Sequence, residues 1–315
     1  MKKQKILVLL STYNGERYIC EQLDSLLAQD GVSLSLYIRD DGSTDSTQTM
    51  IEDYVQRYPE IIKYYPTDNI GAKGSFFELM ELAYVNKDDS DYFAFCDQDD
   101  VWDKQKLLRA LILLNAENRT VPIMYCSTTQ MVDAELLPLS VWPISPRKPL
   151  TMYNALVENV AVGCTTVFNK ESIRLLISHL PKKQDHVIMH DWWSYLCIST
   201  FGKVVFDEKP FIKYRQHSSN VLGGNTDSWV GKWKKRFQRF SKGQNHYIIS
   251  NQAREFYSCY KHLLELSDKN AIQNFLDSIE RNGIQRLLYI LRSPFYRQSS
   301  MDNLILKVIY TLGKV

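Results

Sequence analysis

The feature that most constrains the fold is an alternation of short apolar runs with segments of helical periodicity. The apolar runs are typical of strands buried in a parallel sheet, and they cover residues 6–10, 34–38, 61–65 and 92–96. Between them, apolar residues recur every three or four positions over residues 15–29, 45–57 and 74–84. Strands that alternate with helices predict a mostly parallel sheet with helices on both faces.

The pattern changes after residue 115. Two more strands are expected at 122–130 and 159–168, joined by a connection rich in proline. The expected elements that follow are helices at 170–180 and 190–200 and short strands at 203–206 and 211–216. From about residue 225 to Leu312 the pattern is helical throughout. We therefore predict an α/β domain over residues 1–222 and a helical region over 223–315.

Charge is distributed unevenly along the 315 residues. Hydrophobic residues make up 44% and charged residues 23%, which predicts an ordinary folded core. Residues 1–202 carry 19 Lys and Arg against 27 Asp and Glu, whereas residues 203–315 carry 19 against 9. This asymmetry indicates an anionic partner for the C-terminal part, either membrane phosphate or nucleic acid.

Motifs of several common protein classes are missing from the sequence. There is no CxxC pair, no GxxxxGK[ST] loop, no GxGxxG after the first strand and no GxSxG turn. The six cysteines are scattered and mostly lie in apolar stretches, which predicts reduced, buried thiols. Only five apolar residues precede Ser11, which is too few for the core of a signal peptide. No apolar run reaches the length of about 18 residues that a membrane-spanning helix needs, so no such helix is expected.

Polar clusters follow the first four strands at the point where each strand ends. They are residues 11–14, 39–43, 68–71 and 97–100. Any one of them could simply cap the next helix, because Ser, Thr, Asn and Asp favour that position. Four in succession favour a ligand site, because ligands of open α/β sheets bind beyond the carboxyl ends of the strands.

The last cluster, Asp97-Gln98-Asp99-Asp100, places three carboxylates within four residues, directly after an apolar strand. Such carboxylates repel one another unless a cation neutralises them. Hard oxygen ligands favour Mg²⁺ or Mn²⁺, and substrate phosphates commonly complete the coordination. A solvated acidic turn is the alternative.

Two later segments also carry candidate functional groups. Asp191, between His190 and Trp192, begins a predicted helix, where it could be a capping residue or a general base. His217 and Arg215 follow a short strand, and a lone histidine in such a place is more often structural than a ligand.

With these residues in view, the chain resembles the inverting enzymes of glycosyltransferase family 2, which have the GT-A fold. The resemblance covers about residues 4–220. The matching segments are Ser11-Thr12-Tyr13-Asn14-Gly15, Asp40-Asp41-Gly42-Ser43-Thr44-Asp45, Asn69-Ile70-Gly71, Asp97-Gln98-Asp99 and His190-Asp191-Trp192. Within the family, residues 95–102 look most like bacterial rhamnosyltransferases of cell-wall or surface polysaccharide synthesis. The implied fold is a single Rossmann-like GT-A domain with a C-terminal helical extension.

The resemblance implies a role for each matching residue. Asp41 would bind the pyrimidine base, Asp97 the ribose or donor sugar, and Asp99 the metal at the diphosphate. The remaining donor-site residues would be Thr12, Tyr13, Asn14, Glu16, Asn69, Gly71, Lys73 and Gln98. Asp191 would be the catalytic base, His190 and Trp192 would lie on the acceptor side, and His217 would approach the metal.

These roles imply one displacement at the anomeric carbon, with inversion of configuration. A β-L-rhamnosyl donor would give an α-L-rhamnoside. Mn²⁺ or Mg²⁺ would offset the charge that develops on the departing nucleoside diphosphate. The resemblance also implies a nucleotide-sugar donor and a lipid-linked saccharide acceptor.

The C-terminal region combines aromatic and basic residues. Trp229, Trp233, Phe237 and Phe240 share one face of a predicted helix, and no acid occurs from 228 to 242. This stripe suits an anionic membrane surface, although it could also pack on the catalytic domain. Residues 284–311 repeat the pattern and could contact a membrane, the catalytic domain or a second copy in a homodimer.

Nucleic acid is not expected as a partner, since no motif that reads bases accompanies the positive charge. The predicted location is the cytoplasm, peripheral on the inner face of the cell membrane.

Three functional classes remain open from the sequence. The first is a metal-dependent glycosyltransferase, with rhamnose or a UDP-hexose as the donor sugar. The second is a nucleotidyltransferase, but the loop after the first strand, Ser-Thr-Tyr-Asn-Gly-Glu-Arg, is not the Gly-rich basic loop that such an enzyme needs. The third is a non-catalytic carbohydrate-binding or scaffold protein, which would not need Asp97, Asp99 and Asp191 together.

Overall fold

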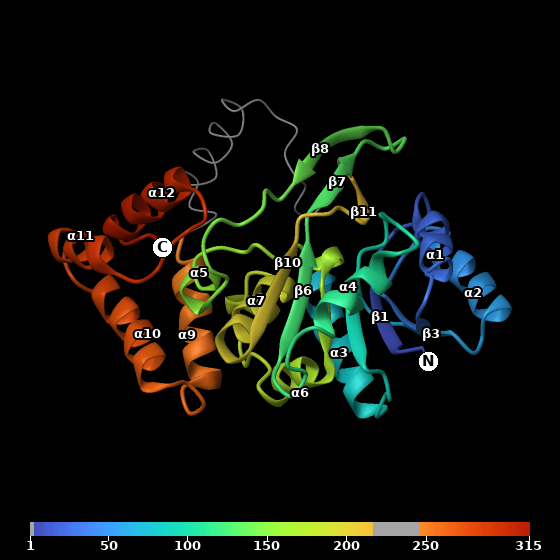
Figure 1. Ribbon diagram of the computed structural model, residues 1–315, viewed down its shortest axis with the longest axis horizontal. Helices are drawn as coiled ribbons and strands as arrows, with labels where there is room; N and C mark the ends of the chain where they lie inside the picture. Colours follow the sequence, from blue (N-terminus) through green and yellow to red (C-terminus); the bar gives the residue numbers. More distant parts are fainter. Residues whose placement is uncertain (1–2, 217–245) are drawn as a thin grey trace. The chain divides into compact units, whose positions relative to one another are not determined.

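A computed structural model describes residues 3–216 and 246–315 of the chain (Figure 1). The predicted metal-site residue His217 and the predicted membrane segment 229–242 lie outside these residues. The described residues form two compact units. The first contains residues 3–145, 161–178 and 197–216, and the second contains residues 146–160, 179–196 and 246–315.

The first unit is built on a seven-stranded sheet with the strand order β10-β6-β9-β4-β1-β2-β3. Its strands are β1 (Lys5–Thr12), β2 (Ser33–Asp40), β3 (Ile62–Pro66), β4 (Tyr92–Cys96), β6 (Ile123–Ser127), β9 (Val167–Asn169) and β10 (Lys203–Asp207). The pairs around β1 are parallel, and β9 runs antiparallel to both of its neighbours. Residues 6–10 of β1 are completely buried, as their unbroken apolar run predicts for a central parallel strand.

Helices of the first unit pack on this sheet. They are α1 (Ile19–Leu27), α2 (Thr47–Arg57), α3 (Gly71–Val85), α4 (Lys106–Leu114) and α6 (Lys170–Ser178). In α1, Ile19, Leu23 and Leu26 recur every three or four positions and are completely buried, so one apolar stripe holds the helix on the core. Helix α3 contacts β1 and β2, α4 contacts β6, and α6 contacts β9.

A smaller sheet of the first unit has the order β5-β11-β7-β8. Its strands are β5 (Val101–Trp102), β7 (Thr129–Val132), β8 (Pro138–Trp142) and β11 (Ile212–Arg215). Strand β5 follows the acidic turn 97–100 and pairs with β11, so this sheet supports the turn from behind. The short 3₁₀ helix η1 (Gly163–Thr165) also contacts β4.

The second unit is helical in the residues described. It contains α5 (Met152–Ala155), η2 (Gln184–His186), the first part of α7 (His190–Phe201), α9 (Ile248–Tyr260), α10 (Leu266–Ile279), α11 (Gly283–Arg292) and α12 (Ser300–Thr311). Phe256, Tyr260, Phe275 and Tyr310 are completely buried within it. Helix α9 contacts η2 and α10, and α11 contacts α12.

The sequence predictions of an α/β sheet and of C-terminal helices are confirmed. Two details differ. Residues 138–142 form an edge strand inside the expected connection, and the strand expected over 159–168 is reduced to Val167–Asn169 after η1. All six cysteines are free, and five of them are buried, as their apolar surroundings predict. The division at residues 222 and 223 stays a prediction, because its boundary lies among residues that are not described.

Candidate active site

The ends of three neighbouring strands bring the predicted donor-site segments to one edge of the sheet. Thr12 at the end of β1 is in register with Asp40 at the end of β2. On the other side, Leu10 of β1 is in register with Cys96, the last residue of β4. Residues 11–16, 39–43 and 97–100 therefore emerge side by side, at the carboxyl ends where open α/β sheets bind ligands.

Gln98 joins two of these segments through its side-chain amide. Its Oε1 accepts hydrogen bonds from the Thr12 hydroxyl at 2.6 Å and from the Tyr13 backbone N–H at 2.8 Å. Its Nε2 donates to the Tyr13 carbonyl at 3.1 Å. Three hydrogen bonds from one side chain fix the loop after β1 against the turn after β4. Tyr13 itself remains exposed, with 47% of its surface accessible.

Gly15 is required by this arrangement. A Cβ atom at Gly15 would lie 2.5 Å from Gln98 Oε1 and 3.0 Å from the Thr12 hydroxyl. Real Cβ atoms do not approach other atoms so closely, so any side chain at this position would displace Gln98.

Asn14 and Glu16 connect the same loop to the start of α2. Asn14, in a left-handed conformation with φ 48°, accepts a hydrogen bond from the Thr44 N–H at 2.8 Å through its side chain. Glu16 Oε2 accepts from the Ser46 N–H at 3.0 Å. Both residues are exposed at this edge, and both hold loop backbone in place.

Asp41 is buried with Arg39 at the end of β2. Its Oδ1 accepts hydrogen bonds from the Arg39 guanidinium and from the Ile70 N–H at 2.8 Å, and its Oδ2 accepts from the Gly71 N–H at 2.8 Å. These bonds fix the loop before α3 and satisfy backbone donors at the start of that helix. Only 2% of Asp41 is accessible, so three of about four lone-pair positions of its carboxylate already have protein partners.

The remaining residues of the predicted diphosphate side lie in and around the first turn of α3. Asn69 is exposed, Gly71 begins the helix with φ 80°, and Lys73 is half-buried. A positive φ of this size explains why glycine stands at residue 71. A Cβ there would meet nothing within 4 Å, so space above this turn is open.

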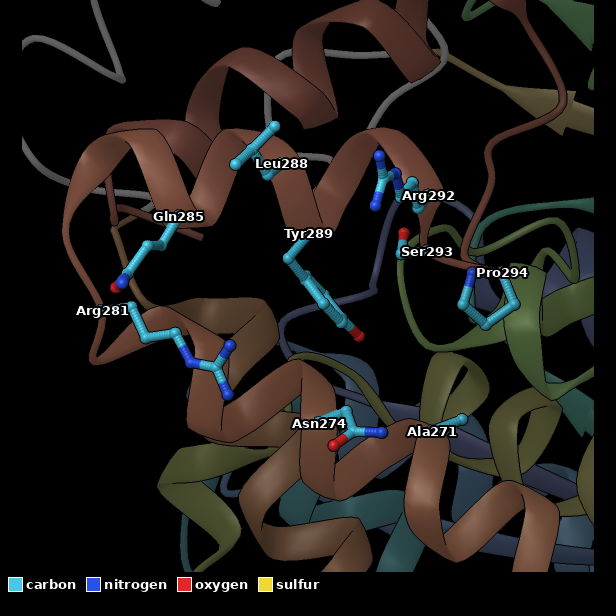
Figure 2. Close-up of a pocket in the computed structure, with 9 residues that line it drawn as sticks. All are labelled: Ala271, Asn274, Arg281, Gln285, Leu288, Tyr289, Arg292, Ser293 and Pro294. Atoms are coloured by element: carbon cyan, nitrogen blue, oxygen red, sulfur yellow. The ribbon is translucent and has the colours of Figure 1, made fainter.

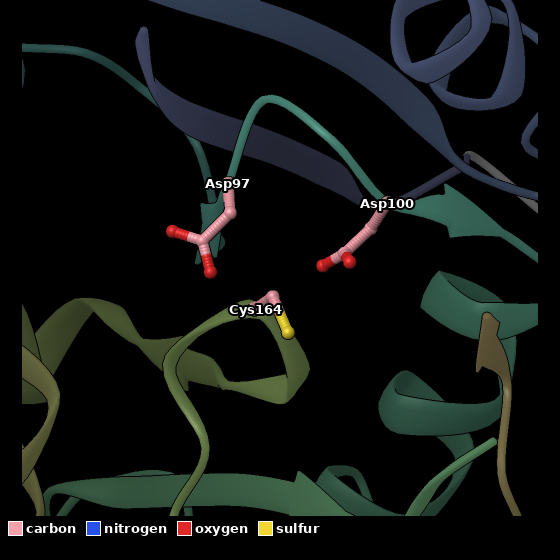
Figure 3. Close-up of side chains that lie close together, drawn as sticks. All are labelled: Asp97, Asp100 and Cys164. Carbon is pink, nitrogen blue, oxygen red and sulfur yellow. The ribbon is translucent and has the colours of Figure 1, made fainter. Parts of the chain in front are cut away.

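A group of donor atoms that could hold a metal ion lies behind the acidic turn. One oxygen each of Asp97 and Asp100 and the Sγ of Cys164 lie within 4.8 Å of one another. Figure 3 shows how these three side chains lie close together. Among the described residues this is the one such group with at least three members. Asp97 is half-buried, whereas Asp100 and Cys164 are completely buried. Asp99, the predicted metal ligand, is also half-buried but does not belong to the group.

Burial changes the ionisation of the innermost residues. Desolvation, followed by the charges of Asp99 and Asp97, raises the pKa of Asp100 well above its usual range. Desolvation also raises the pKa of the Cys164 thiol well above its usual range. Nearby, burial lowers the pKa of Lys106 to about 7, and its Nζ lies 3.1 Å from the centroid of the Trp102 ring.

Arg215 holds the turn from the side of β11. Its backbone N–H donates to Asp100 Oδ1 at 3.1 Å, and its Nε donates to the Asp99 carbonyl at 2.9 Å. Its guanidinium also pairs with Glu21 and lies 4.3 Å from the centroid of the Tyr18 ring. Arg215 is 2% exposed, so a buried cation in direct contact fixes the backbone of the acidic turn.

Asp191, the predicted base, lies in the second unit at the start of α7. Its Oδ1 accepts a hydrogen bond from the Trp192 N–H at 2.6 Å, and its Oδ2 accepts from Asn159 Nδ2 at 3.1 Å. Both bonds orient the carboxylate at a helix N-terminus, where negative charge is favoured. Asp191 is half-buried, so part of it remains accessible.

The two neighbours of Asp191 differ in character. The Trp192 indole Nε1 donates to the Ala155 carbonyl at 2.6 Å, which leaves the half-buried ring fixed beside Asp191. His190 is 3% exposed, and burial lowers its pKa to about 3. At neutral pH His190 is therefore uncharged.

The structure thus gathers the predicted donor-site residues at one sheet edge and places the predicted acceptor-side residues in the second unit. Cys164 and Lys106 were not predicted as site residues, yet they lie close to the acidic turn. Asp100 and Arg215 were noted in the sequence but were given no role. The DQDD sequence pointed to Asp100, but Cys164 is 64 residues further along and carries no local signal.

Comparison with solved structures gives the fold of the protein. The crystal structure of S. aureus TarS residues 1–349 in complex with UDP-GlcNAc has a TM-score of 0.56 at 16% identity and covers 99% of this chain and 93% of that chain. The mannosyltransferase PcManGT from Pyrobaculum calidifontis, in complex with GDP-Man and Mn²⁺, has a TM-score of 0.50 at 15% identity and covers 99% and 86%. The mostly parallel sheet and these neighbours define a protein of the GT-A fold.

Sequence comparison gives the family. The profile described as Glycosyl transferase family 2 matches residues 7–176. A Shigella flexneri protein named dTDP-rhamnosyl transferase RfbG is 33% identical over 240 residues, which cover 72% of this chain and 77% of that protein. The chain belongs to glycosyltransferase family 2 and is a rhamnosyltransferase-like enzyme.

Proposed function

We propose that this enzyme transfers L-rhamnose from dTDP-β-L-rhamnose to a hydroxyl group of a growing bacterial cell-wall polysaccharide. The observation that carries the proposal is the 33% identity to a dTDP-rhamnosyl transferase over most of both chains. A family 2 transferase with a UDP-hexose donor is the second candidate, because the solved TarS structure contains UDP-GlcNAc.

The donor would bind at the edge formed by β1, β2 and β4. Thr12, Tyr13, Asn14 and Glu16 lie in the loop after β1, and Gln98 fixes that loop through Thr12 and Tyr13. In this proposal the exposed Tyr13 ring faces the nucleotide and Asp41 recognises the pyrimidine. The open first turn of α3, with Asn69, Gly71 and Lys73, suits the ribose and the diphosphate.

The acidic turn suits a divalent cation. Asp97 and Asp99 offer carboxylate oxygens, which are the ligands that Mg²⁺ and Mn²⁺ prefer. The proximity of Asp97 to Asp100 supports this, because neighbouring carboxylates are stabilised by a shared cation. We assign the metal to Asp99, and to His217 from the sequence, with Asp97 facing the ribose or the donor sugar. When bound, the cation offsets negative charge on the nucleoside diphosphate.

Asp191 is the proposed base. Its carboxylate, oriented by Asn159 and by the Trp192 N–H, would accept the proton of the acceptor hydroxyl. The acceptor oxygen then bonds to the anomeric carbon as the bond to the diphosphate oxygen breaks on the opposite face. The product of this single displacement is an α-L-rhamnoside. His190 and Trp192 would line the acceptor side, where neutral His190 adds no charge.

The acceptor is proposed to be a lipid-linked saccharide, handled at the inner face of the cell membrane. No helix in the described part of the chain is both long and apolar enough to cross a membrane. Contact with the membrane is proposed to be peripheral, through the basic aromatic segment 229–242.

The test is transfer from dTDP-β-L-rhamnose to lipid-linked saccharides extracted from bacteria that make rhamnose-containing polysaccharide. The anomeric configuration of the product is then measured by NMR. We expect an α-L-rhamnoside. A β-L-rhamnoside would contradict the single displacement, and a product formed only with UDP-sugars would favour the second candidate.

A further inference from the structure

Helices α11 and α12, which pack on each other in the second unit, carry an unusual number of exposed apolar side chains. Eight of the 22 exposed large hydrophobic residues in the described ranges lie on these two short helices. In each helix they recur every three or four positions, so they form one stripe along it. They are Ile284, Leu287, Leu288 and Leu291 on α11, and Met301, Leu304, Val308 and Leu312 on or just after α12.

The exposed stripes are not the faces that hold these helices in the fold. Ile290 on α11 and Leu306 and Tyr310 on α12 are the buried residues, with at most 1% of their surface accessible. By contrast, Ile284 is 74% exposed and Leu304 is 57% exposed. The buried side chains therefore make the core contacts of α11 and α12. The exposed apolar stripes are available for contact with a partner.

The same region is strongly basic. Residues 281–315 contain six Lys and Arg residues and one acid, Asp302. Arg281 precedes α11 and Arg292 ends it, so cations stand at both ends of the first apolar stripe. Within the described residues neither of these two guanidiniums forms an ion pair.

A cavity of about 460 Å³ lies between α10 and α11, and both arginines line it (Figure 2). Leu288 belongs to this cavity and also to the exposed stripe. Tyr289 is another lining residue, and its buried hydroxyl has no hydrogen-bond partner among the described residues. Asn274, Gln285 and Ser293 add further polar groups.

Arg281 and Arg292, at the two ends of one cavity, suit phosphate groups. The adjoining leucines suit hydrocarbon. An anionic phospholipid combines both, with its phosphate and its acyl chains held close together. Helices of 10 and 12 residues are too short to cross a bilayer, but amphipathic helices of this kind lie in its surface.

A second copy of the chain fits the surface less well. A symmetric dimer through this face would bring Arg281 and Arg292 of the two copies together. The acids of residues 277–315 are Asp277, Glu280 and Asp302, and Glu280 already pairs with Arg254. A membrane that contains anionic lipid supplies the missing negative charge.

We infer that α11 and α12 dock on the surface of an anionic phospholipid membrane, and that lipid phosphates pair with Arg281 and Arg292 at the two ends of the cavity. This inference rests on the helical unit alone. It does not depend on the donor, on the acceptor or on a contact by residues 229–242.

The test is sedimentation of the full chain with vesicles of phosphatidylcholine alone and of equimolar phosphatidylcholine and phosphatidylglycerol. We expect binding to the anionic vesicles, weakened by salt. Arg281→Gln combined with Arg292→Gln should weaken this binding by about 30-fold, since each cation contributes on the order of 1 kcal/mol at an anionic surface. Leu287→Ser combined with Leu291→Ser should weaken it by about tenfold or more.

Matched controls lie in the other unit. Lys104→Gln combined with Lys209→Gln removes two exposed cations, and Ile112→Ser removes an exposed apolar side chain on α4. Both should bind vesicles as the unchanged protein does, and thermal unfolding shows that each variant is folded. Vesicle binding that survives in both test variants overturns the inference. So does a dimer in solution that the leucine variant disrupts while vesicle binding stays unchanged. Hydrolysis of the donor, measured on the same variants, reports separately on the proposed activity.

Discussion

The backbone N–H of Arg215 on β11 donates a hydrogen bond of 3.1 Å to the buried carboxylate of Asp100. The two residues are 115 positions apart in the sequence. This bond and the bond from Arg215 Nε to the Asp99 carbonyl fix the acidic turn to the smaller sheet. The carboxylates of Asp97 and Asp99, which are proposed to act at the donor site, therefore project from a turn whose backbone is fixed on its buried side.

Replacement of Asp100 tests this support. Asp100→Ala leaves the Arg215 N–H buried without an acceptor, which should lower the free energy of unfolding by about 1–3 kcal/mol. Asp100→Asn keeps a carbonyl oxygen at the same place and should cost less. Urea unfolding without metal measures both, with Glu52→Ala on the exposed face of α2 as the control. Equal loss in the Ala and Asn variants would contradict the role of the hydrogen bond.

Gly15 and Gln98 should act as a coupled pair. Gly15→Ala places a methyl group where the Gln98 amide lies, so it should displace Gln98 and weaken donor binding by about tenfold or more. Because Gln98→Ala removes the obstruction, the double variant should bind donor no more weakly than Gln98→Ala alone. Isothermal titration of the four proteins forms a double-mutant cycle. Strictly additive losses would show that the two residues do not act on each other.

His190 should make stability depend on pH. Its pKa of about 3 lies below the usual value near 6.5, so the folded state binds fewer protons than the unfolded state between these values. The stability that this group contributes is present above about pH 6.5 and is lost as pH falls toward 3. His190→Phe should therefore flatten the decline of the unfolding free energy over this range by up to a few kcal/mol.

The control for His190 is His262→Gln, because His262 is exposed. Chemical unfolding at a series of pH values gives the curves for all three proteins. A decline in the His190→Phe protein as steep as in the unchanged protein would contradict the burial argument.

The variant Asp191→Asn tests whether Asp191 acts in the transfer step and not in donor binding. The amide introduced by this substitution would keep an oxygen for the hydrogen bond from the Trp192 N–H, but it cannot take the proton of the acceptor hydroxyl as a base. Transfer should fall by at least about a hundredfold while the affinity for donor stays within about twofold. The measurements are product formation and donor titration. Full activity in this variant would remove Asp191 from the mechanism.

The sequence predicted those strands and helices whose own residues carry a clear pattern, and it missed elements that depend on a neighbouring strand. The strand β1 was predicted because its apolar run is unbroken and central in the sheet. Strand β8 was not predicted, because Pro138 begins it, Pro143 follows it, and all five of its residues are exposed. Proline is tolerated at the start of an edge strand, and that position cannot be recognised without the neighbouring strand.

The candidate site shows the same limit. The residues at the ends of β1, β2 and β4 were predicted to meet because parallel strands share one edge. The contacts behind them were not, since Arg215 and Cys164 reach the acidic turn only through the fold of the chain. Nothing in the sequence indicated that both oxygens of Asp41 are engaged by protein donors.

The most direct test of the central claim is release of nucleoside diphosphate from a panel of nucleotide sugars, with Mn²⁺, Mg²⁺ or EDTA present. The panel contains dTDP-rhamnose, UDP-glucose, UDP-galactose and UDP-N-acetylglucosamine. We predict metal-dependent turnover of dTDP-rhamnose and none of the UDP-sugars. Turnover of a UDP-sugar with no turnover or binding of dTDP-rhamnose would contradict the proposed donor.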